Sequence, residues 1–283
     1  MTTAATRSGL IDSGSTKLYY ELLGSGPTVL LISGGADDAG QWAHVAPVLA
    51  NECTVVAYDR RGFSRSPRPD GWTATSVAEH ADDAAALLRG LGHSPAAIVG
   101  HSSGASIACS LVEQHRDLVR HALIYEAPLL AVVPDGDRIV AGMRAAIDQA
   151  FAEGGPRRAM EIFIRANAGD EGFEHWIQSA DGASRERVLD NGAVFFAIEL
   201  PAFATFIPDR AGMRASGVPL AVAVGEESRG TWLEAASAWL AEGTGAELVT
   251  LPGGHAGFDT HPHAFVDLVR RGAAEHAGDR GPP

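Results

Sequence analysis

Two adjacent serines lie between glycines in "VGHSSGAS" (99–106), directly after a short apolar run. The segment Gly100-His101-Ser102-Ser103-Gly104 has the spacing G-x-S-x-G, with Ser102 at its centre. Glycine on both sides permits a sharp turn from a strand into a helix, which exposes the central hydroxyl above the sheet. The first N–H groups of that helix have no partner within the helix. We therefore predict Ser102 as a nucleophile and the Ser103 N–H as an oxyanion donor.

A serine hydroxyl needs a base to take its proton, and the chain offers eleven histidines. His255 follows the last apolar run, inside the Gly-Gly loop of "LPGGHAGF", where ligands collect at the carboxyl ends of strands. His101 belongs to the elbow, but the turn that exposes Ser102 aims its neighbour elsewhere. His261 and His263 are spaced i, i+2 with no further ligands nearby in the sequence. We predict His255 as the general base and expect no metal and no cofactor.

An acid must hold the imidazole in its working tautomer. The spacing G-x-x-Asp after "PLAVAVG" would put that acid at position 228, which is a serine. Glu126 ends the apolar run "RHALIYE", and a carboxylate there needs a partner because burying it alone is costly. We predict Glu126 as the acid, with Glu227 as the alternative.

The second oxyanion donor is expected in the loop after "VLLI". Ser33-Gly34-Gly35-Ala36 lets the backbone approach a substrate oxygen closely, and the N–H of Gly35 is the best-placed donor.

These residues need elements to position them, and the chain alternates strand-like with helix-like segments. Strand alternating with helix predicts an α/β fold with a doubly wound, mostly parallel sheet. The segment 16–24 adds an antiparallel edge hairpin. The expected buried strands are 30–35, 53–59, 96–101, 120–126, 219–225 and 246–253, and the expected helices are 39–50, 76–92, 103–115, 230–243 and 262–276.

One long stretch interrupts the alternation after the sixth core strand. Residues 129–213 are helical in pattern and rich in aromatic residues, which predicts a helical cap inserted between two parts of a core, 1–128 and 214–283. Its aromatic residues suit an apolar, medium-sized substrate, with Trp176 as a predicted substrate-binding residue. The aromatic residues are Phe151, Phe163, Trp176, Phe195, Phe196, Phe203 and Phe206.

The composition and net charge limit the kinds of molecule that the protein is expected to bind. The 283 residues are 46 % apolar and 20 % charged, enough to bury a large core, and the net charge of −13 disfavours nucleic acid and anionic membranes. The beginning of the chain lacks the apolar core of a signal peptide, and two cysteines give no disulfide framework. We expect a cytoplasmic protein that acts on a small molecule. A homodimer is left open.

The motifs "SGGADDAGQW", "YDRRGFSRS", "GHSSGAS" and "LPGGHAGFDTHPHAF" resemble the α/β-hydrolase superfamily over nearly the whole chain. Within it, the chain is most similar to the fungal zearalenone lactone hydrolases, which carry a G-x-S-S-G-A-S elbow, a glutamate in an "E-x-P" setting and an "LPG-x-H" loop followed by "HP". This resemblance implies a triad of Ser102, Glu126 and His255, with Gly35 and Ser103 as oxyanion donors. It also places Phe195 at that family's substrate-stacking tryptophan.

The residues and the resemblance together predict a serine esterase or lactonase that works through an acyl-enzyme. An epoxide hydrolase or dehalogenase of this fold would carry aspartate at the nucleophile position, where this chain has Ser102. A cofactor-free perhydrolase or oxygenase, or a C–C bond hydrolase, could keep the same serine and histidine. A non-catalytic ligand receptor on the same scaffold is the alternative from a different class.

Overall fold

The computed structural model describes residues 6–275, with side chains from 6 to 271. Its centre is a sheet of eight strands in the order β1-β2-β4-β3-β5-β6-β7-β8. The pairs from β3 and β4 through to β7 and β8 are parallel, and β1 and β2 form the antiparallel edge. The strands are β1 (Arg7–Ser13), β2 (Thr16–Gly24), β3 (Thr28–Ile32), β4 (Thr54–Tyr58), β5 (Ala96–His101), β6 (Val119–Tyr125), β7 (Leu220–Gly225) and β8 (Glu247–Leu251).

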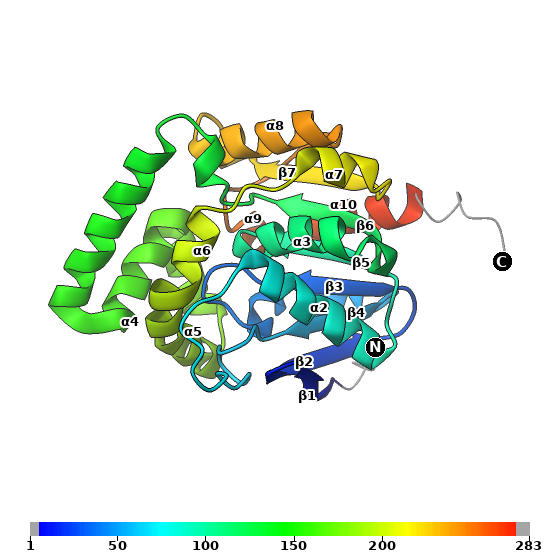
Figure 1. Ribbon diagram of the computed structural model, residues 1–283, viewed down its shortest axis with the longest axis horizontal. Coiled ribbons are helices and arrows are strands. Elements are labelled where there is room, and N and C mark those ends of the chain that lie inside the picture. The colour runs from blue at the N-terminus through cyan, green and yellow to red at the C-terminus, as the bar shows by residue number, and fades with distance from the viewer. Residues whose placement is uncertain (1–5, 276–283) are drawn as a thin grey trace.

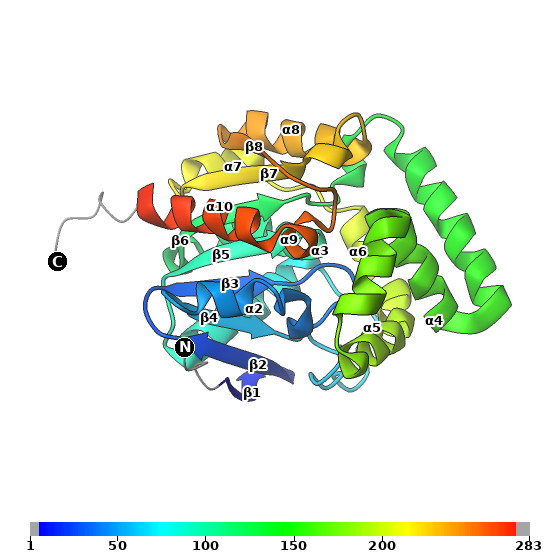
Figure 2. The ribbon, with the colours of Figure 1, turned by 180° about the vertical axis from the view of Figure 1, so that it is seen from behind.

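Helices cover both faces of the sheet, as the prediction of a doubly wound fold requires (Figures 1 and 2). One face carries α2 (Val77–Leu91), α3 (Ser103–Gln114), α7 (Arg210–Ala215) and α8 (Trp232–Thr244). The other carries α1 (Ala46–Leu49), α9 (Gly257–Thr260) and α10 (Pro262–Glu275). Short 3-10 turns lie between these elements: η1 (Ala39–Trp42), η2 (Arg116–Leu118), η3 (Leu130–Val132) and η5 (Glu226–Ser228).

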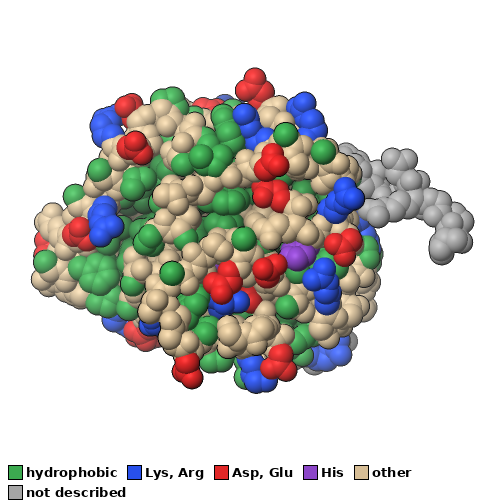
Figure 3. Space-filling view, viewed as in Figure 1, with side chains coloured by type: hydrophobic (Ala, Val, Ile, Leu, Met, Phe, Trp, Pro, Cys, Tyr) green, Lys and Arg blue, Asp and Glu red, His purple; other side chains and the backbone are tan. Residues whose placement is uncertain are grey.

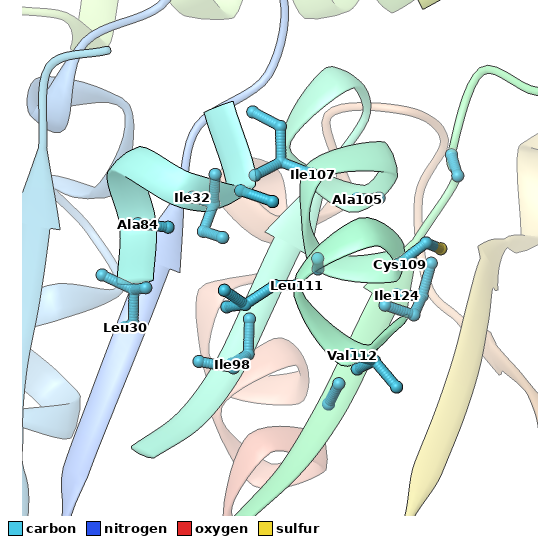
Figure 4. Close-up of a cluster of buried hydrophobic side chains, with 14 of the residues drawn as sticks. Leu30, Ile32, Ala84, Ile98, Ala105, Ile107, Cys109, Leu111, Val112 and Ile124 are labelled. Atoms are coloured by element: carbon cyan, nitrogen blue, oxygen red, sulfur yellow. The ribbon is translucent and has the colours of Figure 1, made fainter. Parts of the chain in front are cut away.

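The apolar strands are buried because helices pack on both sides of them. Figure 4 shows Leu111 and Val112 of α3 against Ile98 of β5 and Ile124 of β6. Every residue of β3, β4 and β5 is buried, which is the pattern expected of central parallel strands. The rigid centre of the sheet therefore lies directly beneath the turn between β5 and α3.

The segment between β6 and β7 forms a separate helical layer at the carboxyl ends of the parallel strands (Figure 2). We call residues 136–204 the cap. It consists of α4 (Gly136–Ser179), α5 (Gly182–Val194), the π-helical turn η4 (Phe195–Glu199) and α6 (Leu200–Ala204). α4 bends where Gly154 and Gly155 leave helical geometry, just before Pro156.

The insertion follows β6 as predicted, but α7 packs against α3 and α8 beside the sheet. Part of the predicted range 129–213 therefore belongs structurally with the core. Figure 3 shows hydrophobic side chains gathered over the cap, at the left of the view. An apolar groove there runs between the first part of α4 and η4 with α6, lined by Val140, Met143, Ile147, Phe151, Phe196 and Leu200 among others.

The cysteines form no disulfide with each other in the structure. Cys53 and Cys109 are both free thiols, Cys109 fully buried in α3. Within residues 6–275, every helix is too short or too polar to cross a bilayer. Residues 1–5 and 276–283 of the predicted core range lie outside the described residues.

Candidate active site

Ser102 occupies a strained turn between β5 and α3. Its backbone has φ 53° and ψ −123°, a conformation that costs energy for any residue with a Cβ atom. The Ser102 N–H donates to the carbonyl of Tyr125 at 2.9 Å, which ties the turn to β6. This is the geometry that the G-x-S-x-G spacing predicts.

The glycines of the elbow are required by close backbone approach. A Cβ atom on Gly104 would lie 2.1 Å from the carbonyl oxygen of Ile32, and one on Gly100 would lie 2.3 Å from that of Gly104. Gly34, in the loop after β3, would place a Cβ atom 2.8 Å from that of Ser102. The loop after β3 can therefore pass directly beside the serine only because it carries no side chain there.

His255 and Glu126 form a close pair. The Nδ1 atom of His255 lies 2.6 Å from Oε2 of Glu126, and both side chains are at least nine-tenths buried. The other carboxylate oxygen of Glu126 accepts a hydrogen bond from the Gly225 N–H at 2.7 Å. The structure thus brings together the two residues that the sequence selected from the ends of β6 and β8.

The surroundings of Glu126 keep it ionised. Burial raises the pKa of Glu126, but the hydrogen bond and charge of His255, with the hydroxyl of Ser228 and the N–H of Gly225, hold its pKa below the ordinary value. Ser228 stands where the G-x-x-Asp spacing would have placed the acid, and it supports Glu126 instead. Glu227 is exposed, and Nδ1 of His255 is paired with Glu126 instead.

Ser102 and His255 both line one pocket, but their side chains are not hydrogen-bonded to each other in this structure. Such bonds are often long in enzymes without substrate and tighten when substrate binds. His101 contacts the loop that carries His255. Its Nε2 lies 2.9 Å from the carbonyl of His255, and its ring centroid is 4.5 Å from that of His255.

His101 is a site residue whose role sequence reasoning missed. Burial, followed by the nearby His255, lowers the pKa of His101 well below its usual value, so the ring is neutral. Its Nδ1 lies 3.0 Å from Nε2 of Gln41, and Gln41 in turn accepts from the Gly34 N–H at 2.9 Å. A neutral ring therefore links the His255 loop to the loop after β3. The elbow spacing alone gave no signal of this link.

Of the two predicted oxyanion donors, Gly35 lines the same pocket as Ser102, and Ser103 directly follows Ser102. Gly35 has φ +37°, and Ser103 is the first residue of α3. Within the described part of the chain, the N–H groups of Gly35 and Ser103 have no hydrogen-bond partner. An oxyanion-binding position requires unpaired N–H donors near the nucleophile, so Gly35 and Ser103 stay the predicted donors.

Arg60 positions the loop that carries Gly35. It follows β4, is 1 % exposed, and donates to the carbonyls of Ser33, at 2.6 Å, and of Gly35. The same guanidinium binds Glu199 of η4 in a two-pronged ion pair, at 3.0 and 2.9 Å. The cap and the oxyanion loop are therefore connected through one buried arginine.

We call the pocket above Ser102 the Ser102 pocket. Its walls come from the core loops and from α4 and α5 of the cap, and most of them are apolar. Trp176 lines the pocket, as predicted, together with Met160, Phe163, Ile164, Val188 and Phe258. These mostly apolar walls suit an apolar ligand.

Phe195 does not line this pocket. It is 1 % exposed and packs edge-on against Phe163, with ring centroids 5.0 Å apart, so Phe163 stands between it and the cavity. Phe195 lies at the start of η4, where the wider π-helical turn directs it into the cap interior. The sequence could not place one aromatic residue relative to another within the cap, because that order depends on the bends in α4.

Asp37 adds a titratable group to the pocket wall. Burial and the neighbouring carboxylates of Asp38 and Asp259, opposed by Arg60, raise the pKa of Asp37 to about 7. Its Oδ2 accepts from Nε2 of Gln41 at 3.1 Å. A carboxyl group two residues after Gly35 therefore changes charge near neutral pH.

Comparison with known proteins agrees with this architecture. The family model described as "Alpha/beta hydrolase family" matches residues 29–268. The uncharacterized hydrolase YraK of Bacillus subtilis is 30 % identical over 265 residues, covering 92 % of this chain and 94 % of that protein. The fluoroacetate dehalogenase of a Burkholderia species is 35 % identical over 136 residues, about half of each chain.

Among solved structures, the enol-lactonase from Burkholderia xenovorans superposes with a TM-score of 0.76 at 19 % identity, over 94 % of this chain and all of that one. At this identity the likeness concerns the fold. The family model spans most of the chain, and its match includes β3, the serine elbow and the His255 loop. The chain therefore belongs to the alpha/beta hydrolase family.

Proposed function

We propose that this protein is a serine hydrolase that cleaves a carboxylic ester, in particular a lactone of an apolar, medium-sized molecule. The observation that carries the proposal is the 2.6 Å pair between His255 and Glu126, beside a pocket that also contains Ser102 in its strained turn. A base held by a buried carboxylate, in the same pocket as a serine hydroxyl, is the arrangement needed for acyl transfer.

In the proposed reaction, the Ser102 hydroxyl attacks the ester carbonyl while its proton passes to Nε2 of His255. Glu126 stabilises the imidazolium through Nδ1, and the N–H groups of Gly35 and Ser103 bind the negatively charged oxygen. The imidazolium gives its proton to the leaving alkoxide, which stays attached to the acyl group when the substrate is a lactone. Water, deprotonated by His255, then releases the acid and restores Ser102.

The pocket supports the proposed substrate class. Trp176, Phe163 and Phe258 offer flat apolar surface, and Asn167 and Ser184 offer a few polar contacts for orientation. A macrolactone with an aromatic ring, such as zearalenone, combines these properties and is the specific substrate that we propose to test first.

Serine at position 102 disfavours dehalogenation and epoxide opening, because enzymes of this fold that perform them use aspartate as the nucleophile. Perhydrolysis, oxygenation and C–C bond cleavage give products different from those of ester hydrolysis, so product analysis distinguishes them. A receptor would bind ligand without turnover and without reaction of Ser102.

The test is an assay of aryl esters, γ-lactones and macrolactones, including zearalenone, with wild-type protein and Ser102→Ala. We expect ring-opened or hydrolysed product, heavier than the lactone by one water, and covalent labelling of Ser102 by a fluorophosphonate. Ser102→Ala should keep its circular dichroism spectrum and lose both. Undiminished hydrolysis by Ser102→Ala, or no hydrolysis and no labelling of the wild type, would refute the proposal.

A further inference from the structure

Three side chains at the mouth of the Ser102 pocket meet around one point. Nδ1 of His44 lies 2.6 Å from Oδ1 of Asp259, and Nε2 of His175 lies 3.0 Å from Oδ2 of the same carboxylate. One atom from each residue, two ring nitrogens and a carboxylate oxygen, can be chosen so that all lie within 4.8 Å of one another. None of the three has a part in the proposed ester chemistry.

The three residues come from distant parts of the chain. His44 lies just after η1 in the core, Asp259 lies in α9, and His175 lies near the end of α4 in the cap. His44 and Asp259 line the pocket, and His175 directly precedes Trp176 of its wall. The cluster therefore bridges the cap and the core at the rim of the cavity.

Hydrogen bonding leaves one of these groups unsatisfied. Nε2 of His175 is buried from solvent, yet its approach to Asp259 lacks the alignment of a hydrogen bond. A buried ring nitrogen with no aligned partner calls for an explanation. A cation bound between the nitrogen and the carboxylate would supply the missing interaction.

We propose that His44, His175 and Asp259 form a binding site for one divalent transition-metal ion of the zinc class, which ties the cap to the core. Two imidazoles and one carboxylate are a common ligand set for Zn²⁺, with water completing the tetrahedron. Tetrahedral zinc bonds of this kind place ligand atoms about 3.3 Å apart, so the spacings of 2.6 Å (His44 to Asp259) and 3.0 Å (His175 to Asp259) would open by about 0.7 and about 0.3 Å. Mg²⁺ prefers oxygen ligands and is not expected there.

The charges around the site favour a cation. Asp37 lines the same pocket, and its pKa is raised first by burial and then by the negative charges of Asp38 and Asp259, which Arg60 opposes. The chain as a whole carries a net charge of −13. A bound Zn²⁺ would offset this repulsion.

Binding at this site would act on the cap and on the catalytic loop together. Asp259 lies four residues after His255, and His175 belongs to the helix that carries Trp176. A metal bound to both residues would restrain α4 relative to α9. The cap could then move away from the core less freely, and the pocket would open less often. The proposal does not depend on the identity of the substrate or on ester hydrolysis.

The test begins with protein dialysed against a chelator and then against chelator-free buffer. Isothermal titration calorimetry with ZnCl₂ should show saturable binding of one ion per chain, and MgCl₂ should give none. His175→Gln and His44→Gln should each weaken zinc binding about 100-fold or more, since loss of a supporting residue alone costs 10–100-fold. His263→Gln is the matched control, because His263 is exposed and forms no ion pair with residues 6–271, and it should bind like wild type.

Two outcomes would overturn the proposal. One is the absence of stoichiometric zinc binding. The other is binding that survives in the double variant His44→Gln/His175→Gln, which would place the ion elsewhere. Circular dichroism of each variant without metal checks that the fold is retained.

The proposed restraint of the cap by the metal can be measured separately, by amide hydrogen exchange. Zinc should slow amide hydrogen exchange in residues 170–179 of wild-type protein and leave exchange unchanged in His175→Gln. Stoichiometric zinc binding with no slowing in these residues would reject the tie.

Discussion

Arg60 and Glu199 form a buried, two-pronged ion pair that joins the core to the cap. Their side chains are 1 % and 0 % exposed, and Arg60 also holds the carbonyls of Ser33 and Gly35. Nε2 of His80 lies 3.3 Å from the same carboxylate. The position of the proposed oxyanion donor Gly35 therefore depends on a cap residue far away in the sequence.

Removing one partner of this pair should be costly. Glu199→Gln leaves the Arg60 charge buried without its counter-ion, and we expect the free energy of unfolding to fall by about 3–5 kcal/mol in urea denaturation. Glu186→Gln is the control, because its ion pair with Arg157 is largely exposed and should change stability by less than about 1 kcal/mol. Equal effects of the two substitutions would contradict the structural role of Glu199.

The two candidate acids can be separated by kinetics. Glu126→Gln removes the carboxylate that orients His255, and we expect kcat to fall by about 10³–10⁴, as for loss of the acid in other triads. Glu227→Gln should leave kcat close to wild type, since Nδ1 of His255 is already paired with Glu126. A larger loss in Glu227→Gln than in Glu126→Gln would reverse the assignment.

Glu126 also has a pH signature in stability. Its pKa is lowered in the folded protein, so its stabilising contribution is complete above the ordinary value of 4.5 and is lost as the pH falls through the depressed folded pKa. The difference in unfolding free energy between wild type and Glu126→Gln should therefore shrink below about pH 4.5. Chemical denaturation between neutral and acidic pH measures this. A difference that grows on acidification would contradict it.

Asp37 should make the stability of the folded protein depend on pH near neutrality. Because its pKa is raised to about 7, the folded protein keeps a proton that the unfolded chain has lost, and stability falls as the pH rises from about 4 to about 7. Asp37→Asn removes this cost and should stabilise the protein at pH 8 by about 2 kcal/mol, since water screens part of the penalty at a partly exposed carboxyl.

The same substitution should raise kcat/KM on the alkaline side, where ionised Asp37 places a negative charge near the developing oxyanion. A full pH profile of ester hydrolysis for Asp37→Asn, with Asp70→Asn as an exposed control, measures this effect. An unchanged ratio of variant to wild type between pH 6 and 8 would exclude a role for Asp37 ionisation.

The close approach of Gly104 to the backbone of Ile32 predicts that a side chain at position 104 would clash. Gly104→Ala forces a Cβ atom to within 2.1 Å of the Ile32 carbonyl, and we expect it to destabilise the protein by several kcal/mol or to prevent folding. Gly142→Ala in α4 meets nothing within 4 Å and should stabilise by about 0.5–1 kcal/mol. Thermal denaturation of both variants tests the pair. A neutral Gly104→Ala would show that the elbow is less constrained than its geometry indicates.

The sequence by itself determined the order of strands and helices and the residues at the strand ends. Buried parallel strands must be apolar along their whole length, so β3 to β6 stand out, and the first polar residue after each marks the edge of the sheet. Glu126 was selected in this way, Ser102 from the G-x-S-x-G spacing and His255 from its Gly-Gly loop, and the structure places all three at that edge. Local turn chemistry, with glycine where the backbone approaches closely, supplied the rest of that selection.

Only the tertiary structure decided which side chains meet across the cap. Phe163 rather than Phe195 faces the cavity because bends at Gly155 and in η4 rotate the helix faces. The connections made by His101 and Arg60, and the cluster of His44, His175 and Asp259, join residues that no sequence period relates. Periodicity reports which face of one element is buried. Contacts between elements depend on how those elements are placed in space.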